Sequence, residues 1–226
     1  AALGPHADGR ATMVRALHPS AQSIDLRLMA TGQLRPMTKR GADGLHEIRI
    51  EPAAPDEAGA PDYRLRFTFP DGHAVEIDDP YRYGRVLTDF DLHLFGEGTH
   101  YRAHEKLGAH RLTIGSTTGV HFAVWAPNAL RVSLLGDLNG WDGRVHPMRL
   151  LASAGVWEIF IPDLADGEKY KFEIHTQAGA ILTKTDPFGV AFETPPHTAS
   201  IVRDISGYTW TDRAWMAERP GHGAWL

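Results

Sequence analysis

Cysteine is absent from this chain of 226 residues. Its absence excludes disulfide bridges, thiolate metal sites and cysteine nucleophiles, and it is typical of the reducing cytosol. The chain also lacks an apolar run of the roughly 20 residues that a membrane helix needs, and its start has no charged region followed by an apolar core. We therefore expect a soluble cytoplasmic protein without a membrane partner. Because the chain begins with Ala1 and not with Met, we also expect that its front has been trimmed.

Basic clusters are equally scarce. No block of Lys and Arg is longer than two residues, the formal net charge is -5 and the pI is about 6.2. A surface that follows the phosphates of a nucleic acid needs clustered positive charge. We therefore expect no nucleic-acid partner.

Catalytic motifs are missing as well. The chain has no Gly-rich phosphate loop, no Gly-x-Ser-x-Gly elbow and no helical metal motif. Its 28 acidic residues include no pair that stands out as the two facing carboxylates of a glycosidase. The histidines His93, His100, His104 and His110 have no carboxylate pattern that would complete a ligand set. We predict no catalytic residue, no metal and no cofactor.

Alternating apolar and polar residues dominate what is present. Tyr170, Phe172 and Ile174 fall on one face of a strand, and the same alternation places Val120, Phe122 and Val124 together. Gly, Pro and Asn residues bound each run. Short strands at this spacing predict an antiparallel β-sandwich.

The chain also contains an internal repeat. Leu3-Gly4-Pro5-His6 matches Leu107-Gly108-Ala109-His110, and Asp79-Pro80-Tyr81 matches Asp186-Pro187-Phe188. We therefore predict an all-β protein of two tandem sandwiches with similar topology, at residues 1–84 and 107–205. The linker at 85–106 has apolar residues at helical spacing and Thr88 as a possible N-cap, so it is predicted to be partly helical. Residues 51–62 read as a mobile loop.

Specific motifs indicate a family. Residues 119–129 read GVHFAVWAPNA and residues 136–142 read GDLNGWD, which resembles the family-48 carbohydrate-binding modules, immunoglobulin-like sandwiches of glycogen-active enzymes. Further segments make the chain similar to bacterial glycogen branching enzymes over nearly its whole length. These segments are LGAH at 107–110, HPM at 146–148, GVWE at 155–158, YKFEI at 170–174, KTDP at 184–187, LFGEGTH at 94–100, YTW at 208–210 and WM at 215–216.

This resemblance implies a role in glycogen biosynthesis. Branching enzymes cut an α-1,4-glucan chain and reattach it as an α-1,6 branch, and they do so with carboxylates in a barrel of roughly 250 residues. No comparable segment follows here, so residues 206–226 are expected to lead into a missing catalytic barrel. The resemblance thus implies a non-catalytic N-terminal part that is inactive by itself. Its implied partners are α-1,4-glucan, bound weakly, and the barrel of the parent enzyme.

Three residues are candidates for glycan binding. Trp141 follows Gly and Asn in a loop, where an indole can offer a flat apolar face to a sugar ring, and we expect it to be partly exposed. The alternative for Trp141 is a lid on its own sandwich. By resemblance, Lys171 matches a lysine that donates to a sugar hydroxyl, although it could equally be a solvated side chain. Asn139 is the third candidate, from the turn that carries Trp141.

The predicted glycan site lacks a second aromatic residue. Stand-alone glycogen-targeting modules carry a second aromatic residue where this chain has Ala180 and Ile181, so the affinity should be millimolar. The first copy has Thr31-Gly32-Gln33-Leu34-Arg35 in place of the tryptophan loop, and we expect no glycan there. Trp125 and Trp157 are assigned mainly to packing, although Trp125 lies on the face opposite to Val124 and could meet a neighbouring domain.

Two other functions remain open at this stage. One is a stand-alone glycogen-targeting adaptor, like the β subunits of AMP-activated kinases. The missing second aromatic residue and the branching-type linker argue against it. The other is the front of a debranching enzyme or a trehalose-forming hydrolase. Such relatives usually lack the first module, so the repeat favours branching.

Overall fold

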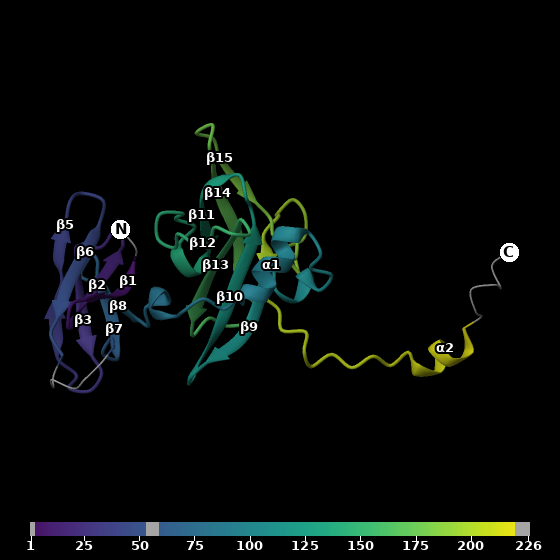
Figure 1. Ribbon diagram of the computed structural model, residues 1–226, viewed down its shortest axis with the longest axis horizontal. Helices are drawn as coiled ribbons and strands as arrows, with labels where there is room; N and C mark the ends of the chain where they lie inside the picture. The colour runs from purple at the N-terminus through teal and green to yellow at the C-terminus, as the bar shows by residue number, and fades with distance from the viewer. Residues whose placement is uncertain (1–2, 53–58, 220–226) are drawn as a thin grey trace.

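The computed structural model describes residues 3–52 and 59–219, which form two β-sandwiches joined by a partly helical linker (Figure 1). All strand pairs among these residues are antiparallel. The predicted all-β fold of two tandem sandwiches is therefore confirmed. Residues 53–58 of the loop expected at 51–62 lie outside the described residues.

The first module contains two four-stranded sheets, in the orders β1-β2-β6-β5 and β4-β3-β7-β8. Alternation builds its core, because β7 turns Tyr63, Leu65 and Phe67 inward and leaves the residues between them half-buried. The strands are β1 (Gly4–Asp8), β2 (Ala11–Leu17), β3 (Ser23–Leu28), β4 (Leu34–Pro36), β5 (Thr38–Arg40), β6 (Leu45–Ile50), β7 (Tyr63–Thr68) and β8 (Ala74–Ile77).

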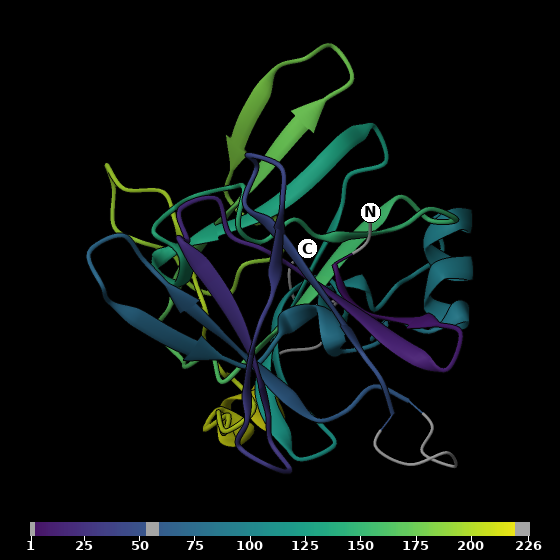
Figure 2. The same ribbon diagram turned by 90° about the vertical axis from the view of Figure 1, so that its left-hand side faces the viewer.

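The second module repeats this strand order. Its sheets run β12-β13-β10-β9 and β11-β14-β15, with β16 beside β14, so β9-β10-β13-β12 corresponds to β1-β2-β6-β5 and β11-β14-β15 to β3-β7-β8. The β14–β15 hairpin projects beyond the rest of the module (Figures 1 and 2). The strands are β9 (Gly108–Ile114), β10 (Thr117–Trp125), β11 (Ala129–Gly136), β12 (Arg149–Leu151), β13 (Val156–Pro162), β14 (Lys169–Thr176), β15 (Ile181–Lys184) and β16 (Ser200–Ile201). The structural repeat predicted from the sequence is confirmed.

Each module contains the same buried Tyr–Asp pair. The Tyr63 hydroxyl donates to Asp79 at 2.6 Å, and the Tyr170 hydroxyl donates to Asp186 at 2.6 Å. Burial raises the pKa of Asp79 to about 6, and burial also raises the pKa of Asp186, although the tyrosine bond partly offsets both shifts. Each Asp-Pro segment of the repeat is therefore the point where the chain leaves its sandwich. A buried hydrogen bond from a core tyrosine holds the chain at that point.

A matched glycine begins each sandwich. Gly4 and Gly108 both have positive φ, and a Cβ atom on either would meet the backbone of Tyr81 or Phe188, which follow the two Asp-Pro segments. Only glycine combines this conformation with so close an approach. The first strand and the exit segment of each module are therefore held together.

The linker is fastened to the second module. It contains α1 (Asp89–Glu97) and η2 (Ala103–Glu105), and η1 (Pro80–Arg82) lies just before it, at the end of the first module. Thr88 is the N-cap of α1, as predicted, in a reciprocal capping box with Asp91. Leu87 and Leu92 pack on Val156, on the outer face of the β12-β13-β10-β9 sheet.

A buried carboxylate holds the start of this linker. Glu158 accepts hydrogen bonds from the backbone N–H groups of Val86 and Leu87 and lies 3.1 Å from Nε2 of His121. Burial raises the pKa of Glu158, but the bonds from His121 and from the two amides outweigh burial, so the net shift is downward. The carboxylate thus stays ionised where the linker meets the sheet.

Two tryptophans of the second module behave differently. Trp157 is buried in the core, as predicted, and its Nε1 donates to the Ala126 carbonyl. The prediction of packing for Trp125 is wrong, because its side chain is 56% exposed. Trp125 pairs with Val156 on the outer face, where the linker covers Val156 but leaves the indole exposed.

The C-terminal described segment extends away from both modules (Figure 1). It contains α2 (Arg213–Glu218), and its side chains Tyr208, Trp210 and Trp215 are exposed. No helix in the described part of the chain is long and apolar enough to cross a membrane.

Candidate functional site

The loop that carries Trp141 leaves the end of β11. It begins with the single turn η3 (Asp137–Asn139), continues through Gly140 in the left-handed conformation, and reaches Trp141 with a φ of 61°. A side chain in this conformation costs roughly 1–2 kcal/mol. The Trp141 N–H donates to the Gly136 carbonyl at 3.0 Å, which closes the loop. The surrounding contacts therefore impose the position of the indole.

The indole of Trp141 is partly exposed, as predicted, with 40% of the residue accessible. Its Nε1 donates to the Asp137 carboxylate at 2.9 Å. This bond satisfies the only polar group of the side chain and fixes the direction of the ring. An apolar face is thereby held toward solvent.

Asn139 lies inside the same loop. Its amide nitrogen donates to the Leu134 carbonyl at 2.8 Å and contacts Nδ1 of His146 at 3.1 Å, while its oxygen accepts from the Gly136 N–H at 3.0 Å. Burial, and to a lesser extent the charge of His18, lowers the pKa of His146 to about 4, so its neutral ring can accept from the amide. The amide of Asn139 is thus engaged in holding the turn.

Lys171 stands in β14 opposite Leu135 of β11. Its Nζ donates to the Thr198 hydroxyl at 2.6 Å, and the Thr185 hydroxyl donates to the Thr198 carbonyl at 2.6 Å. Sequence reasoning missed both threonines. No local pattern connects Thr198 with Lys171, because the segment of Thr198 approaches β14 only through the pairing with β16.

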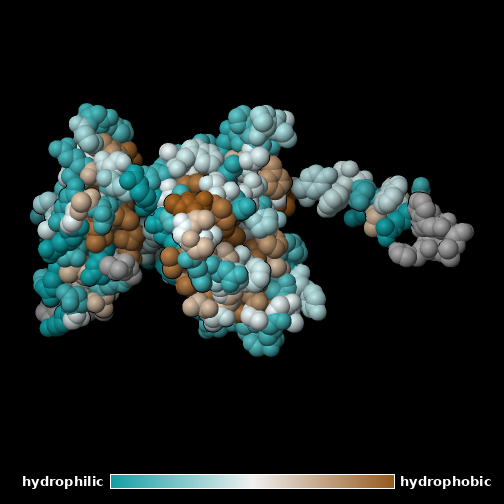
Figure 3. Space-filling view, turned by 90° about the horizontal axis from the view of Figure 1, so that it is seen from above, coloured by the Kyte–Doolittle hydropathy of each residue, from teal (hydrophilic) through white to brown (hydrophobic). Residues whose placement is uncertain are grey.

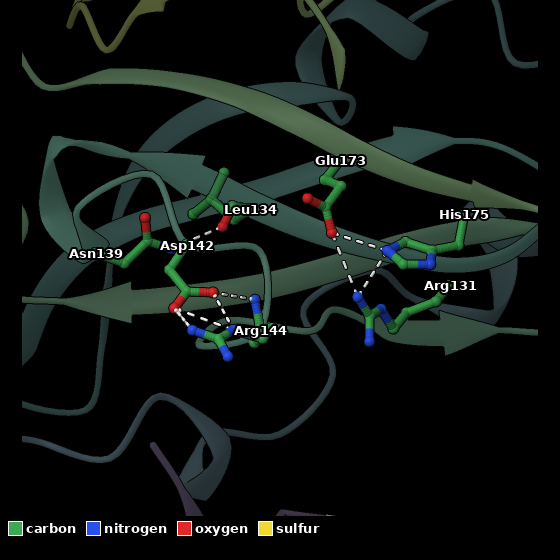
Figure 4. Close-up of polar contacts among 7 residues, drawn as sticks. All are labelled: Arg131, Leu134, Asn139, Asp142, Arg144, Glu173 and His175. Carbon is green, nitrogen blue, oxygen red and sulfur yellow. Dashed lines mark hydrogen bonds and ion pairs between the residues drawn. The ribbon is translucent and has the colours of Figure 1, made fainter. Parts of the chain in front are cut away.

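A polar cluster lies farther along the same face (Figure 4). Glu173 lies 2.9 Å from Nε2 of His175 and accepts from Arg131 at 3.3 Å. A Cβ atom at Gly143 would clash with the Glu173 carboxylate, so the loop passes directly over this side chain. Figure 4 also shows Asn139 directed away from this cluster. Ile181, in place of a second aromatic residue, is 60% exposed on β15.

The histidines considered as ligands have other surroundings. Nε2 of His100 lies 3.1 Å from the Asp91 carboxylate, and its ring stacks on Phe95. Within residues 3–52 and 59–219, no three or more His, Cys, Asp or Glu side chains gather as a metal site would require.

The fold defines a class of protein, a pair of antiparallel β-sandwich modules joined by a partly helical linker. Residues 106–189 match the family model of carbohydrate-binding module 48 (isoamylase N-terminal domain). Residues 1–81 match the N-terminal domain of the alpha-1,4-glucan branching enzyme GlgB. The two modules belong to these families, and together they correspond to the N-terminal region of 1,4-alpha-glucan branching enzymes.

Relatives that match nearly the whole of this chain agree with the two family models. The chain is 48% identical over 218 residues to the 1,4-alpha-glucan branching enzyme GlgB of Paramagnetospirillum magneticum, covering 96% of this chain and 28% of the relative. It is 43% identical over 220 residues to that of Methylococcus capsulatus, covering 97% and 29%. The chain therefore spans under a third of the length of these relatives. Among solved structures, pullulanase from Anoxybacillus sp. LM18-11 is 15% identical, with a TM-score of 0.37 over 90% of this chain and 28% of that chain.

Proposed function

We propose that the second module binds α-1,4-glucan chains weakly, on the surface formed by Trp141 and Lys171. The exposed, fixed indole carries this proposal. An aromatic ring whose polar atom is already satisfied gains most from an apolar partner, and the C–H face of a glucose ring is such a partner. Lys171 is the proposed directional donor of the site, and its ammonium donates to the Thr198 hydroxyl.

Asn139 is assigned a positioning role in this site. Its three hydrogen bonds shape the turn before Trp141. Removing the amide would therefore weaken glucan binding through the indole, without any contact between Asn139 and the sugar.

The affinity should be modest. One aromatic contact contributes about 0.5–1.5 kcal/mol beyond area burial, and association has its own entropic cost. Ile181 offers apolar surface at the second aromatic position but no flat ring. We expect dissociation constants in the millimolar range, which suits a module that guides a multivalent polymer.

The larger role follows from the relatives. We propose that the two modules position α-glucan for a branching enzyme that transfers α-1,4-linked segments into α-1,6 branches, and that a catalytic barrel is their partner. A cytoplasmic location belongs to this proposal and agrees with the lack of cysteine. The described residues form two sandwiches and a linker, so we expect this chain alone to be inactive.

NMR titration with maltoheptaose tests the glucan site. The Trp141 indole resonance should move on addition of the sugar, with a millimolar dissociation constant, and Trp141→Ala should abolish the binding. Lys171→Ala should weaken it several-fold. Trp125→Ala is the matched control, because that indole is also exposed in the second module but lies outside the site. Binding that is absent up to tens of millimolar, or that survives Trp141→Ala unchanged, would sink the proposal.

A further inference from the structure

The surface of the second module is chemically mixed. Seen from above, it exposes hydrophobic surface among hydrophilic residues (Figure 3). Such a mixture suits a sugar, because a pyranose ring has apolar faces and carries hydroxyl groups along its edge. In the glucan site proposed above, Lys171 only donates hydrogen bonds, since an ammonium group has no lone pair. A glucose hydroxyl also donates, so a complete site needs an oxygen that accepts from it.

The Asp137 carboxylate is such an oxygen donor-free group at the edge of the indole. Asp137 is exposed and comes directly after β11, as the first residue of η3. Its Oδ1 accepts from Nε1 of Trp141 at 2.9 Å. Among residues 3–52 and 59–219, the Asp137 side chain makes no other hydrogen bond or ion pair. A carboxylate has about four sites that accept hydrogen bonds, so Oδ2 keeps its capacity to accept while Oδ1 holds the ring.

A positive charge lies on another side of this carboxylate. Lys169 and Lys171 are two residues apart in β14 and therefore point to the same face of the sheet. The Lys169 ammonium contacts Glu193 at 2.9 Å. Glu193, and to a smaller extent Asp137, raises the pKa of Lys169. Asp137 thus lies between the indole, which it contacts, and Lys169, which it attracts.

We propose that Asp137 is a ligand-binding residue of the glucan site, in which one carboxylate oxygen holds the Trp141 indole and the other accepts from hydroxyls of the glucose unit stacked on it. This inference rests on the glucan site proposed above. The equatorial hydroxyls of a stacked glucose unit project past the edge of the indole, and Asp137 lies at the edge that carries Nε1. A charged acceptor forms stronger hydrogen bonds than a neutral one.

A residue that only positioned the indole would need Oδ1 alone. Asp137→Asn separates the two roles, because the amide keeps one oxygen for Nε1 of Trp141 and replaces the other oxygen by a donor. Asp137→Ala removes both. Asp204→Asn is the matched control, because the Asp204 carboxylate is also exposed and also accepts one hydrogen bond, from the Ser206 N–H in the C-terminal segment.

Three quantities would be measured for each protein by NMR and thermal melting. They are the dissociation constant for maltoheptaose, the Trp141 indole N–H resonance without sugar, and the melting temperature. The carboxyl carbon resonance of Asp137 would also be recorded with and without maltoheptaose, in wild type and in Trp141→Ala. This resonance reports on a contact between the carboxylate and the sugar, which a purely positioning role would not produce.

Asp137→Asn should weaken binding about three- to tenfold, and it should leave the indole resonance of the free protein and the melting temperature close to those of wild type. Asp137→Ala should weaken binding at least as much and should also move the indole resonance. Asp204→Asn should stay within about twofold of wild type. The Asp137 carboxyl resonance should shift with sugar in wild type and not in Trp141→Ala.

Two results would overturn the inference. One is that Asp137→Asn binds maltoheptaose as tightly as wild type while Trp141→Ala abolishes binding. The other is that the sugar binds to wild type and leaves the Asp137 carboxyl resonance unmoved. If wild type does not bind at all, or if Trp141→Ala binds as wild type does, it is the proposed glucan site that fails.

Discussion

The twin Tyr–Asp pairs predict a pH-dependent loss of stability when either hydroxyl is removed. Tyr63→Phe deletes the donor to Asp79 and leaves the ring in place. A hydrogen bond to a charged, buried group is worth about 1.5–3 kcal/mol. We therefore expect Tyr63→Phe to lower the free energy of unfolding by about 2 kcal/mol at pH 8, and Tyr170→Phe to act similarly through Asp186.

The pH dependence has a definite sign. The pKa of Asp79 is raised to about 6 from 3.8, so the folded state favours the protonated carboxyl. The stability that comes from this proton is fully present below the unfolded pKa and is lost as the pH rises through about 6. Tyr63 offsets that loss because it donates to the ionised form. The cost of Tyr63→Phe should therefore be largest at pH 8 and smaller at pH 5.

Urea unfolding at pH 8 and pH 5 measures both effects, and the midpoint and slope give the free energy at each pH. Tyr208→Phe is the control, because that ring is exposed in the C-terminal segment. If Tyr63→Phe lowers the free energy of unfolding equally at the two pH values, or by less than about 0.5 kcal/mol at pH 8, then Asp79 is not a buried ionised acceptor of the Tyr63 hydroxyl.

Three further outcomes are expected. The purified chain should neither branch amylose nor hydrolyse maltoheptaose, and turnover above a heat-killed control, with contaminants excluded, would contradict this. Gly143→Ala should cost under about 1 kcal/mol, because its methyl group meets only the far end of the flexible Glu173 side chain, which can move aside; a loss of several kcal/mol in urea unfolding would count against it. Glu158→Gln should lower the melting temperature and speed hydrogen exchange at the Val86 and Leu87 amides, because the charged acceptor of both is lost; protected amides in that variant would disprove the fastening role.

The candidate site shows where sequence reasoning was sufficient and where it was not. The partial exposure of Trp141 followed from a Gly- and Asn-rich turn that cannot bury an indole. The role of Asn139 could not be predicted from the sequence. Nothing in the sequence of the turn indicates that the Asn139 amide donates to the Leu134 carbonyl and contacts the His146 ring. Trp125 and Trp157 both lie in strand patterns, yet only Trp157 is in the core. Trp157 faces the interior of the sandwich, whereas Trp125 lies on the outer face of the same sheet at a position that the linker leaves uncovered.

The sequence by itself determined the two sandwiches, their shared strand order and the capped helix between them. The strands follow from the alternation of apolar and polar residues, and the helix follows from its Thr88 cap; both signals lie in residues that are close along the chain. The shared strand order follows from Asp-Pro and Gly positions that occur in both halves of the sequence. Tertiary structure alone decided that Thr198 holds Lys171 and that Glu158 fastens the linker. Each of these contacts joins residues far apart in sequence, and packing of whole elements, which no local pattern encodes, brings them together.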